Sequence, residues 1–187
     1  MSRDRQGLIL GAIGVLMFSL SLPATREAVP YFGPVITSIG RAVIAALIAG
    51  VVLAMRREPF PGRDHLPGLF MIASGVVVGF PMLTSIALRH LPASHGAVVV
   101  GLLPAATAVC AVLMAGEHPP RAFWGAVAFG VVTVLIFAMV QGAGTPQWED
   151  ALLLGAVAAA AIGYAVGGRM SRDLGGWRVI SWTLIVA

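Results

Sequence analysis

One arginine has the position and chemistry of a ligand-binding residue. Arg41 lies inside the apolar segment 32–55, about nine residues from the nearer end of that segment. Burying a guanidinium in a membrane is costly unless the group faces a cavity or a partner. Two interpretations therefore stand side by side. Arg41 binds an anionic group of a substrate in a cavity, or it is structural, pairing with backbone carbonyls or reaching to the interface.

Hydroxyl-bearing residues inside the apolar segments are further candidates. Ser19, Thr84 and Tyr164 lie within their segments and away from the loops. Most hydroxyls in membrane helices bond to their own backbone or to a neighbouring helix, so only a minority are expected to touch a substrate. His95 opens an apolar segment, and we expect it to be a solvated histidine at a helix end.

Carboxylates are missing from the apolar segments, and this bears on the substrate. Carriers that exchange cationic drugs for protons usually need a membrane carboxylate to hold either cation. The buried charge here is a guanidinium, which does not deprotonate. We therefore expect an anionic or zwitterionic substrate. The sequence has neither a His/Asp/Glu cluster nor an H-E-x-x-H motif, and its single cysteine forms no metal-ligand pattern. We expect no enzyme activity, no metal and no cofactor.

The elements that must position these residues are membrane helices. Hydrophobic residues make up 58% of the 187 residues and charged residues 11%, less than half of the roughly 25% typical of soluble domains. This composition excludes a disordered chain and a nucleic-acid-binding protein. Segments of about twenty apolar residues are long enough to cross the bilayer as helices. Six such spans are predicted, at Gly7–Pro23, Phe32–Met55, Leu66–Leu88, Ser94–Ala115, Ala122–Val140 and Ala151–Gly168.

A seventh apolar segment begins near Val179 and reaches the last residue, Ala187. This partial span is too short to cross the membrane alone, and we expect the chain to be truncated there. The arginines predict the orientation, because short cytoplasmic loops carry an excess of them. A cytoplasmic N-terminus places nine arginines inside and leaves Arg26 and Arg89 outside. The sequence thus predicts a multi-pass protein of the inner (plasma) membrane.

A weak internal echo points to a repeat. At an offset of 144 residues, Leu8–Ala12 is similar to Leu152–Ala156, and Val35–Ile36 is identical to Val179–Ile180. Five helices separate the two copies, so the second copy enters the membrane from the opposite face. This arrangement is the inverted repeat of many secondary transporters. It predicts a first repeat over residues 1–145 and the beginning of a second over 146–187.

Several short motifs together resemble the EamA-type transporters of the drug/metabolite transporter superfamily. The resemblance lies in Ala87–Ser94, Pro104, Glu117, Trp124–Gly125 and Gly130. The chain departs from the family pattern in having Trp124 and Gly125 adjacent, and His90 in place of an aromatic residue. The resemblance implies ten helices in two inverted five-helix repeats. It also assigns Arg41 to a family arginine and Pro104 to a mid-helix proline that lines a cavity.

The sequence and the resemblance together predict a secondary transporter. We expect an exporter of small metabolites, amino-acid-like or otherwise anionic or zwitterionic, that works by alternating access. The alternative is a non-catalytic membrane assembly protein or a dimerising half-transporter. The expected partners are a small-molecule substrate and the lipid bilayer, with no nucleic acid. The predicted substrate-binding residues are Arg41, Ser19, Thr84, Pro104 and Tyr164.

Overall fold

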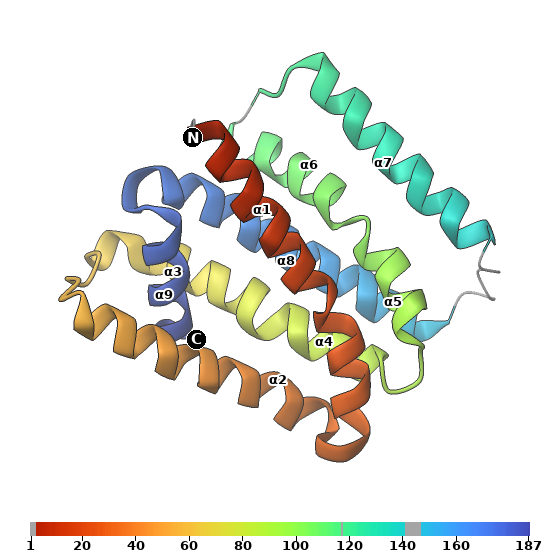
Figure 1. The fold of residues 1–187 in the computed structure, drawn as a ribbon, viewed down its shortest axis with the longest axis horizontal. Coiled ribbons are helices and arrows are strands. Elements are labelled where there is room, and N and C mark those ends of the chain that lie inside the picture. Colours follow the sequence, from red (N-terminus) through yellow and green to blue (C-terminus); the bar gives the residue numbers. More distant parts are fainter. Residues whose placement is uncertain (1–2, 117, 141–146) are drawn as a thin grey trace.

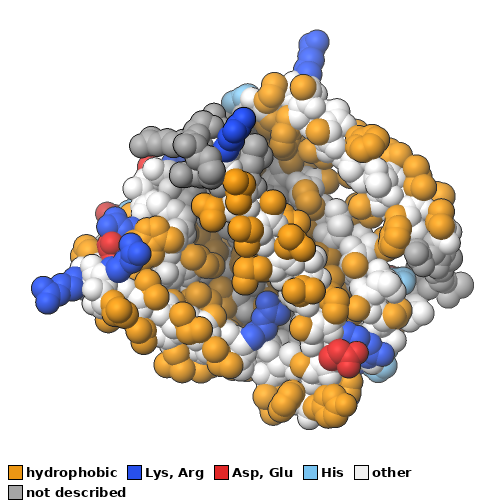
Figure 2. Space-filling model, viewed as in Figure 1, with side chains coloured by type: hydrophobic (Ala, Val, Ile, Leu, Met, Phe, Trp, Pro, Cys, Tyr) orange, Lys and Arg blue, Asp and Glu red, His pale blue; other side chains and the backbone are white. Residues whose placement is uncertain are grey.

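The chain folds into a bundle of helices (Figure 1), seen here in a computed structural model that describes residues 3–116, 118–140 and 147–187. Hydrophobic side chains cover most of the face in Figure 2, and charged side chains lie mainly along its edges. The helices long and apolar enough to cross a membrane are Ile9–Met55, Arg63–Ala87, Ala93–Met114 and Trp148–Leu174, and Arg121–Phe137 is a shorter apolar helix. The prediction of an all-helical membrane protein is confirmed, whereas six full spans and a ten-helix repeat stay predictions.

Residues 3–55 form α1 (Arg3–Ser19) and α2 (Ser21–Met55). The first span is predicted to end at Pro23, whereas α1 ends at Ser19 and Pro23 lies inside α2. Pro23 is the third residue of α2, in the first turn, where a missing N–H breaks no helical bond. The backbone reverses inside α2 at Gly33, whose φ of 74° favours glycine. The apolar helix Ile9–Met55 therefore makes two passes through the bundle (Figure 1).

The third apolar segment is helical throughout but changes its hydrogen bonding midway. It consists of η1 (Arg63–His65), α3 (Leu66–Ile72), the π-helical segment η2 (Ala73–Gly79) and α4 (Phe80–Ala87). The π turn lies directly before Pro81, which has no backbone N–H to donate. At the end of this turn the N–H of Phe80 donates to the carbonyl of Gly75, five residues back. A π turn therefore precedes Pro81 in this segment.

The fourth segment is broken rather than gently kinked. Its two parts are α5 (Ala93–Val100) and α6 (Leu103–Ala115), with a turn between them. Pro104 lies in the first turn of α6, where its missing N–H is tolerated. The next helix, α7 (Arg121–Val140), lies at the edge of the bundle against α5 and α6 (Figure 1).

The centre of the bundle is α8 (Trp148–Leu174), which packs against α3, η2, α4, α5, α6 and α9. Small side chains fill its buried face, including Ala156, Ala160 and Ala161. The last helix, α9 (Gly176–Val186), folds back between α2 and α8. Figure 1 places the N-terminus, the α2–α3 connection and the α8–α9 turn at one end of the bundle, the near end. The α4–α5 connection and the start of α8 lie at the other end, the far end.

Two glycines let η2 and α8 approach closely. A Cβ added at Gly75 would collide with the backbone carbonyl of Ala159, and one added at Gly163 would lie 2.6 Å from the Cγ2 of Val76. Close approach of this kind is the usual role of small residues in membrane helix pairs. By contrast, a Cβ at Gly11 in α1 would meet nothing within 4 Å. The contact between η2 and α8 is thus a backbone-to-backbone contact at the centre of the bundle.

We therefore expect the substitution Gly75→Ala to lower the free energy of unfolding by about 3 kcal/mol, since backbone must shift to admit the methyl group. Reversible unfolding of the detergent-solubilised protein by SDS measures this change. Gly130→Ala in α7 is the matched control, because a Cβ there meets nothing within 4 Å. The control should keep or slightly raise stability, since alanine favours helix. Equal effects of the two substitutions would contradict the close packing of η2 on α8.

Candidate functional site

A cavity with a volume of about 850 Å³ lies among α1, α2, α5, α6, α7 and α8. Three of the five predicted site residues line it: Ser19, Pro104 and Tyr164. They come from three different helices and lie far apart in the sequence. The structure therefore brings three separately predicted residues together in the lining of one cavity.

The break between α5 and α6 shapes one wall of this cavity. Val100, Gly101, Leu103 and Pro104 all line it, on both sides of the turn that separates the two helices. A continuous helix would present only one stripe of side chains to the cavity, whereas the break exposes consecutive residues. Pro104 thus belongs to a cavity wall and lies at a helix break.

Ser19 and Tyr164 supply polar atoms to a cavity that is otherwise mostly apolar. Ser19 is the last residue of α1, and its hydroxyl donates to the carbonyl of Leu16 at 2.7 Å. Tyr164 lies in the middle of α8 and borders a second, smaller cavity as well. Apolar residues from other helices, including Val15, Phe18, Leu22 and Phe123, line the same space. The lining suits a ligand with an apolar body and few polar groups.

Arg41 is related to the cavity by its electrostatic interaction with Tyr164. It is not among the lining residues, and its side chain is exposed on α2. The guanidinium nevertheless interacts electrostatically with the phenol of Tyr164. Tyr164 is the ionisable side chain among the lining residues, and the positive charge of Arg41 acts on it. An anionic group bound beside Tyr164 would be attracted by that charge.

Thr84 lies elsewhere, in the packed core between α2 and α4. Its hydroxyl donates to the carbonyl of Phe80 at 2.7 Å and lies 3.1 Å from that of Pro81, both in its own segment. Beside it, Ser38 of α2 donates to the carbonyl of Pro81 at 3.0 Å and contacts the hydroxyl of Ser85 at 2.9 Å. These bonds join two helices, which is the common role of hydroxyls in membrane bundles. Thr84 is absent from the cavity lining, and a role in substrate binding stays a prediction.

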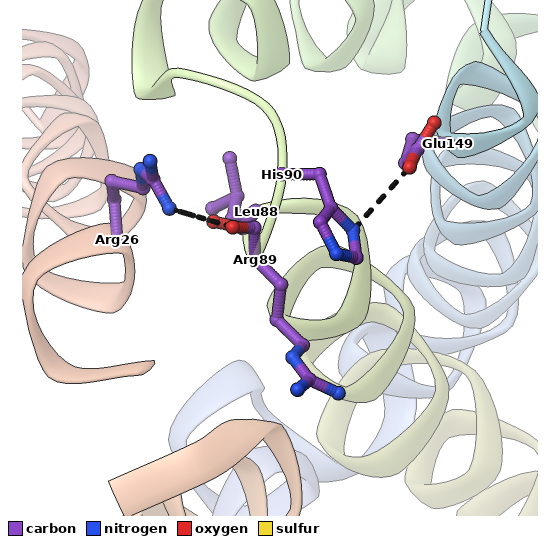
Figure 3. A network of polar contacts seen from close by, with 5 residues as sticks. All are labelled: Arg26, Leu88, Arg89, His90 and Glu149. Atoms are coloured by element: carbon purple, nitrogen blue, oxygen red, sulfur yellow. Dashed lines mark hydrogen bonds and ion pairs between the residues drawn. The ribbon is translucent and has the colours of Figure 1, made fainter. Parts of the chain in front are cut away.

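Sequence reasoning missed a set of polar contacts at the far end. His90 Nδ1 lies 3.3 Å from a carboxylate oxygen of Glu149, and His95 Nε2 lies 2.6 Å from one of Asp150. Figure 3 shows His90 pointing from the α4–α5 connection toward Glu149 at the start of α8. The expectation of a solvated His95 is wrong, because this side chain is paired and largely buried. No local sequence signal links residues 55 apart, so only the fold reveals the pairing.

The near end carries a different set of contacts. A carboxylate oxygen of Glu58 lies 2.5 Å from a guanidinium nitrogen of Arg178. The guanidiniums of Arg56 and Arg178 lie 5.1 and 5.8 Å from the ring centre of Trp177, within the range of cation–π attraction. The family-motif residue Glu117 lies outside the described residues. Within the described residues, no three His, Cys, Asp or Glu side chains gather as metal ligands would.

Comparison with known proteins agrees with this architecture. The family model of the EamA-like transporter family matches residues 5–139. A Bacillus subtilis (strain 168) protein named as the uncharacterized transporter YdeK is 46% identical over 187 residues. The match covers 100% of this chain and 65% of that relative, so the chain spans less than two thirds of its length. No solved structure matches the chain. The family match covers well over half of the residues, and the chain belongs to the EamA-like transporter family.

Proposed function

We propose that this chain carries the substrate site of a secondary transporter for small metabolites with an anionic or zwitterionic group. The observation that carries the proposal is the cavity of about 850 Å³, whose lining includes Tyr164, the side chain that interacts electrostatically with Arg41. Membership of a transporter family supports the function class, and a transporter of this kind is not an enzyme. Substrate class and site are inferred from the residues around the cavity.

The cavity favours a ligand of two parts. Apolar side chains from α1, α2, α6 and α7 would contact an aliphatic or aromatic body. A carboxylate would lie toward Tyr164, where the phenol can donate a hydrogen bond and Arg41 supplies positive charge. No Asp or Glu is among the lining residues, so a cation would find no counter-charge in this wall. Amino-acid-like compounds with apolar side chains meet these requirements.

The transport cycle that we propose is alternating access between two inverted repeats, in the direction of export. The first repeat would comprise residues 1–145 and the second would begin at residue 146. Support comes from the internal echo at an offset of 144 residues and from the resemblance to ten-helix carriers. We place the near end in the cytoplasm and the chain in the inner membrane. Arg56, Arg57 and Arg63 lie in the α2–α3 connection at that end, as the positive-inside rule requires.

Ligand-dependent thermal stability of the purified protein in detergent tests the substrate class. We expect an apolar amino acid or a related carboxylate to raise the melting temperature by about 5 °C at about 100 times its Kd, because it binds only the folded state. Tetraphenylphosphonium, a lipophilic cation, serves as the control and should leave the melting temperature unchanged. Stabilisation by the cation, with none by any carboxylate tested, would refute the anionic site.

A further inference from the structure

Two histidine–carboxylate pairs cross the boundary between the proposed repeats at the far end. His90 and His95 belong to the first repeat, and Glu149 and Asp150 begin the second. The distances are 3.3 Å for His90–Glu149 and 2.6 Å for His95–Asp150. The second pair is anchored further, because the other oxygen of Asp150 accepts the backbone N–H of Gln147 at 2.9 Å. Consecutive residues of α8 are thus each held by a histidine of the first repeat.

Burial makes these pairs sensitive to charge. The side chain of Glu149 is only 6% exposed, whereas that of His90 is 59% exposed. A buried carboxylate needs a partner for its charge, and the side chain that contacts this one is the imidazole of His90. A protonated imidazole supplies a full positive charge, while a neutral one supplies only an N–H. The attraction between the repeats therefore grows as the histidines are protonated.

The connection that bears His90 is itself fixed to α2. Nη1 of Arg26 lies 2.6 Å from the carbonyl oxygen of Leu88 and 3.0 Å from that of Arg89, and it donates to both (Figure 3). In the same connection, Leu91 is 2% exposed and packs with Ala87 of α4 and Leu153 of α8. Separation of α8 from this connection would open the small apolar cluster around Leu91. Exposure of Leu91 thus reports on whether the far end is closed.

The near end offers a contrast that isolates the effect of pH. There the boundary is crossed by the ion pair between Glu58 and Arg178. A guanidinium stays charged at all physiological pH values, whereas histidine changes its charge between about pH 5 and pH 8. The Glu58–Arg178 pair thus keeps its cation throughout this range, whereas the cations of the two far-end pairs are imidazoles, a group that titrates within it.

We propose that the pairs His90–Glu149 and His95–Asp150 form a pH-dependent clasp that closes the far end of the bundle. The clasp is closed at mildly acidic pH and loosens as the pH rises and the imidazoles lose their charge. The other charged groups toward the far end are Arg26 and Glu27 on α2 and Arg89 in the connection, and arginine and glutamate keep their charge in this range. Arg41 on α2 and Arg169, Arg172 and Asp173 on α8 lie further along those helices. The use of the clasp in alternating access rests on the proposed function, whereas the clasp itself does not.

Cysteine labelling measures closure without any substrate. Leu91→Cys and Ser94→Cys are each made in a Cys110→Ser background, and Ser94 is exposed. The labelling ratio is the rate at which the thiol of Leu91→Cys reacts with a water-soluble maleimide divided by the rate for the thiol of Ser94→Cys. The division removes the intrinsic pH dependence of thiol chemistry. We expect the ratio to rise by about tenfold or more between about pH 6 and about pH 8.5, since the closed state binds more protons.

Two variants decide what causes any change. In Glu149→Gln/Asp150→Asn, which keeps the shapes but removes the charges, the ratio should be high already at the lower pH and independent of pH. Glu58→Gln removes a carboxylate from the near-end pair and should behave like the parent. The clasp would be overturned by a parent protein whose labelling ratio does not change with pH. It would also be overturned if Glu58→Gln changed the ratio as much as the double variant does.

A second measurement needs no cysteine variants. It is the rate of backbone amide hydrogen exchange over residues 88–96, corrected for the intrinsic effect of pH. Protection should fall with rising pH in the wild type and should be low at both pH values in the double variant. Equal protection in the two proteins would also overturn the clasp. Neither measurement involves transport, so a failure of the clasp is distinct from a failure of the proposed function.

Discussion

Replacing Arg41 by alanine is expected to weaken the binding of an anionic or zwitterionic ligand by about 100-fold, or nearly 3 kcal/mol, because the charge that attracts its carboxylate is lost. The guanidinium interacts with Tyr164, which lines the cavity, and the lining itself supplies no other cation. Arg41→Lys should also weaken binding, since an ammonium lacks the planar pair of donors that grips a carboxylate. The measurement is a titration of the carboxylate identified by thermal stability, followed by its uptake into proteoliposomes.

The control for this substitution is Arg121→Ala. Arg121 begins α7 at the near end and is exposed, so its loss removes one positive charge without touching the cavity. Equal loss of binding in both variants would indicate a general effect of net charge. Normal binding by Arg41→Ala would show that Arg41 is structural, which is the other interpretation of an arginine inside an apolar segment. The transporter assignment would survive that outcome, because it rests on the family and the helices.

Hydropathy and local chemistry were sufficient to predict the helices and part of the site. Long apolar segments have few alternatives to helix in a bilayer, since every backbone group must be bonded within the segment. The same reasoning selected polar residues in the middle of segments, and Ser19 and Tyr164 indeed lie in one cavity wall. Pro104 was selected through the resemblance to a family, and it lies in the same wall.

Contacts between distant segments could not be predicted in this way. Thr84 and Tyr164 are both hydroxyl-bearing residues within apolar segments. Thr84 nevertheless faces its own helix and the core, because the rotation of a helix depends on its neighbours. Pairing of His95 with Asp150 depends on where α8 begins relative to α5, which no local pattern encodes. Pro23 was read as a helix end, although the first turn of a helix accepts proline equally well.

A bulky side chain at Gly14 should abolish ligand binding by filling the cavity. Gly14 lines the cavity from α1, and a Cβ added there would meet no atom within 4 Å. Gly14→Phe can therefore be accommodated without displacing backbone, and its ring would occupy space that the ligand needs. We expect affinity for the carboxylate to fall by about 100-fold or more, since a ligand excluded from its apolar pocket loses most of its binding energy.

Gly130→Phe is the matched control for this experiment. Gly130 lies on α7 in a helix of similar character, a Cβ there also meets nothing within 4 Å, and the residue does not line the cavity. Both variants should keep the melting temperature of the unliganded protein, so that a loss of binding cannot come from unfolding. Only Gly14→Phe should lose the stabilisation by ligand. If both variants bind normally, the substrate lies outside this cavity, and Arg41 must then be tested against a site at the exposed face of α2.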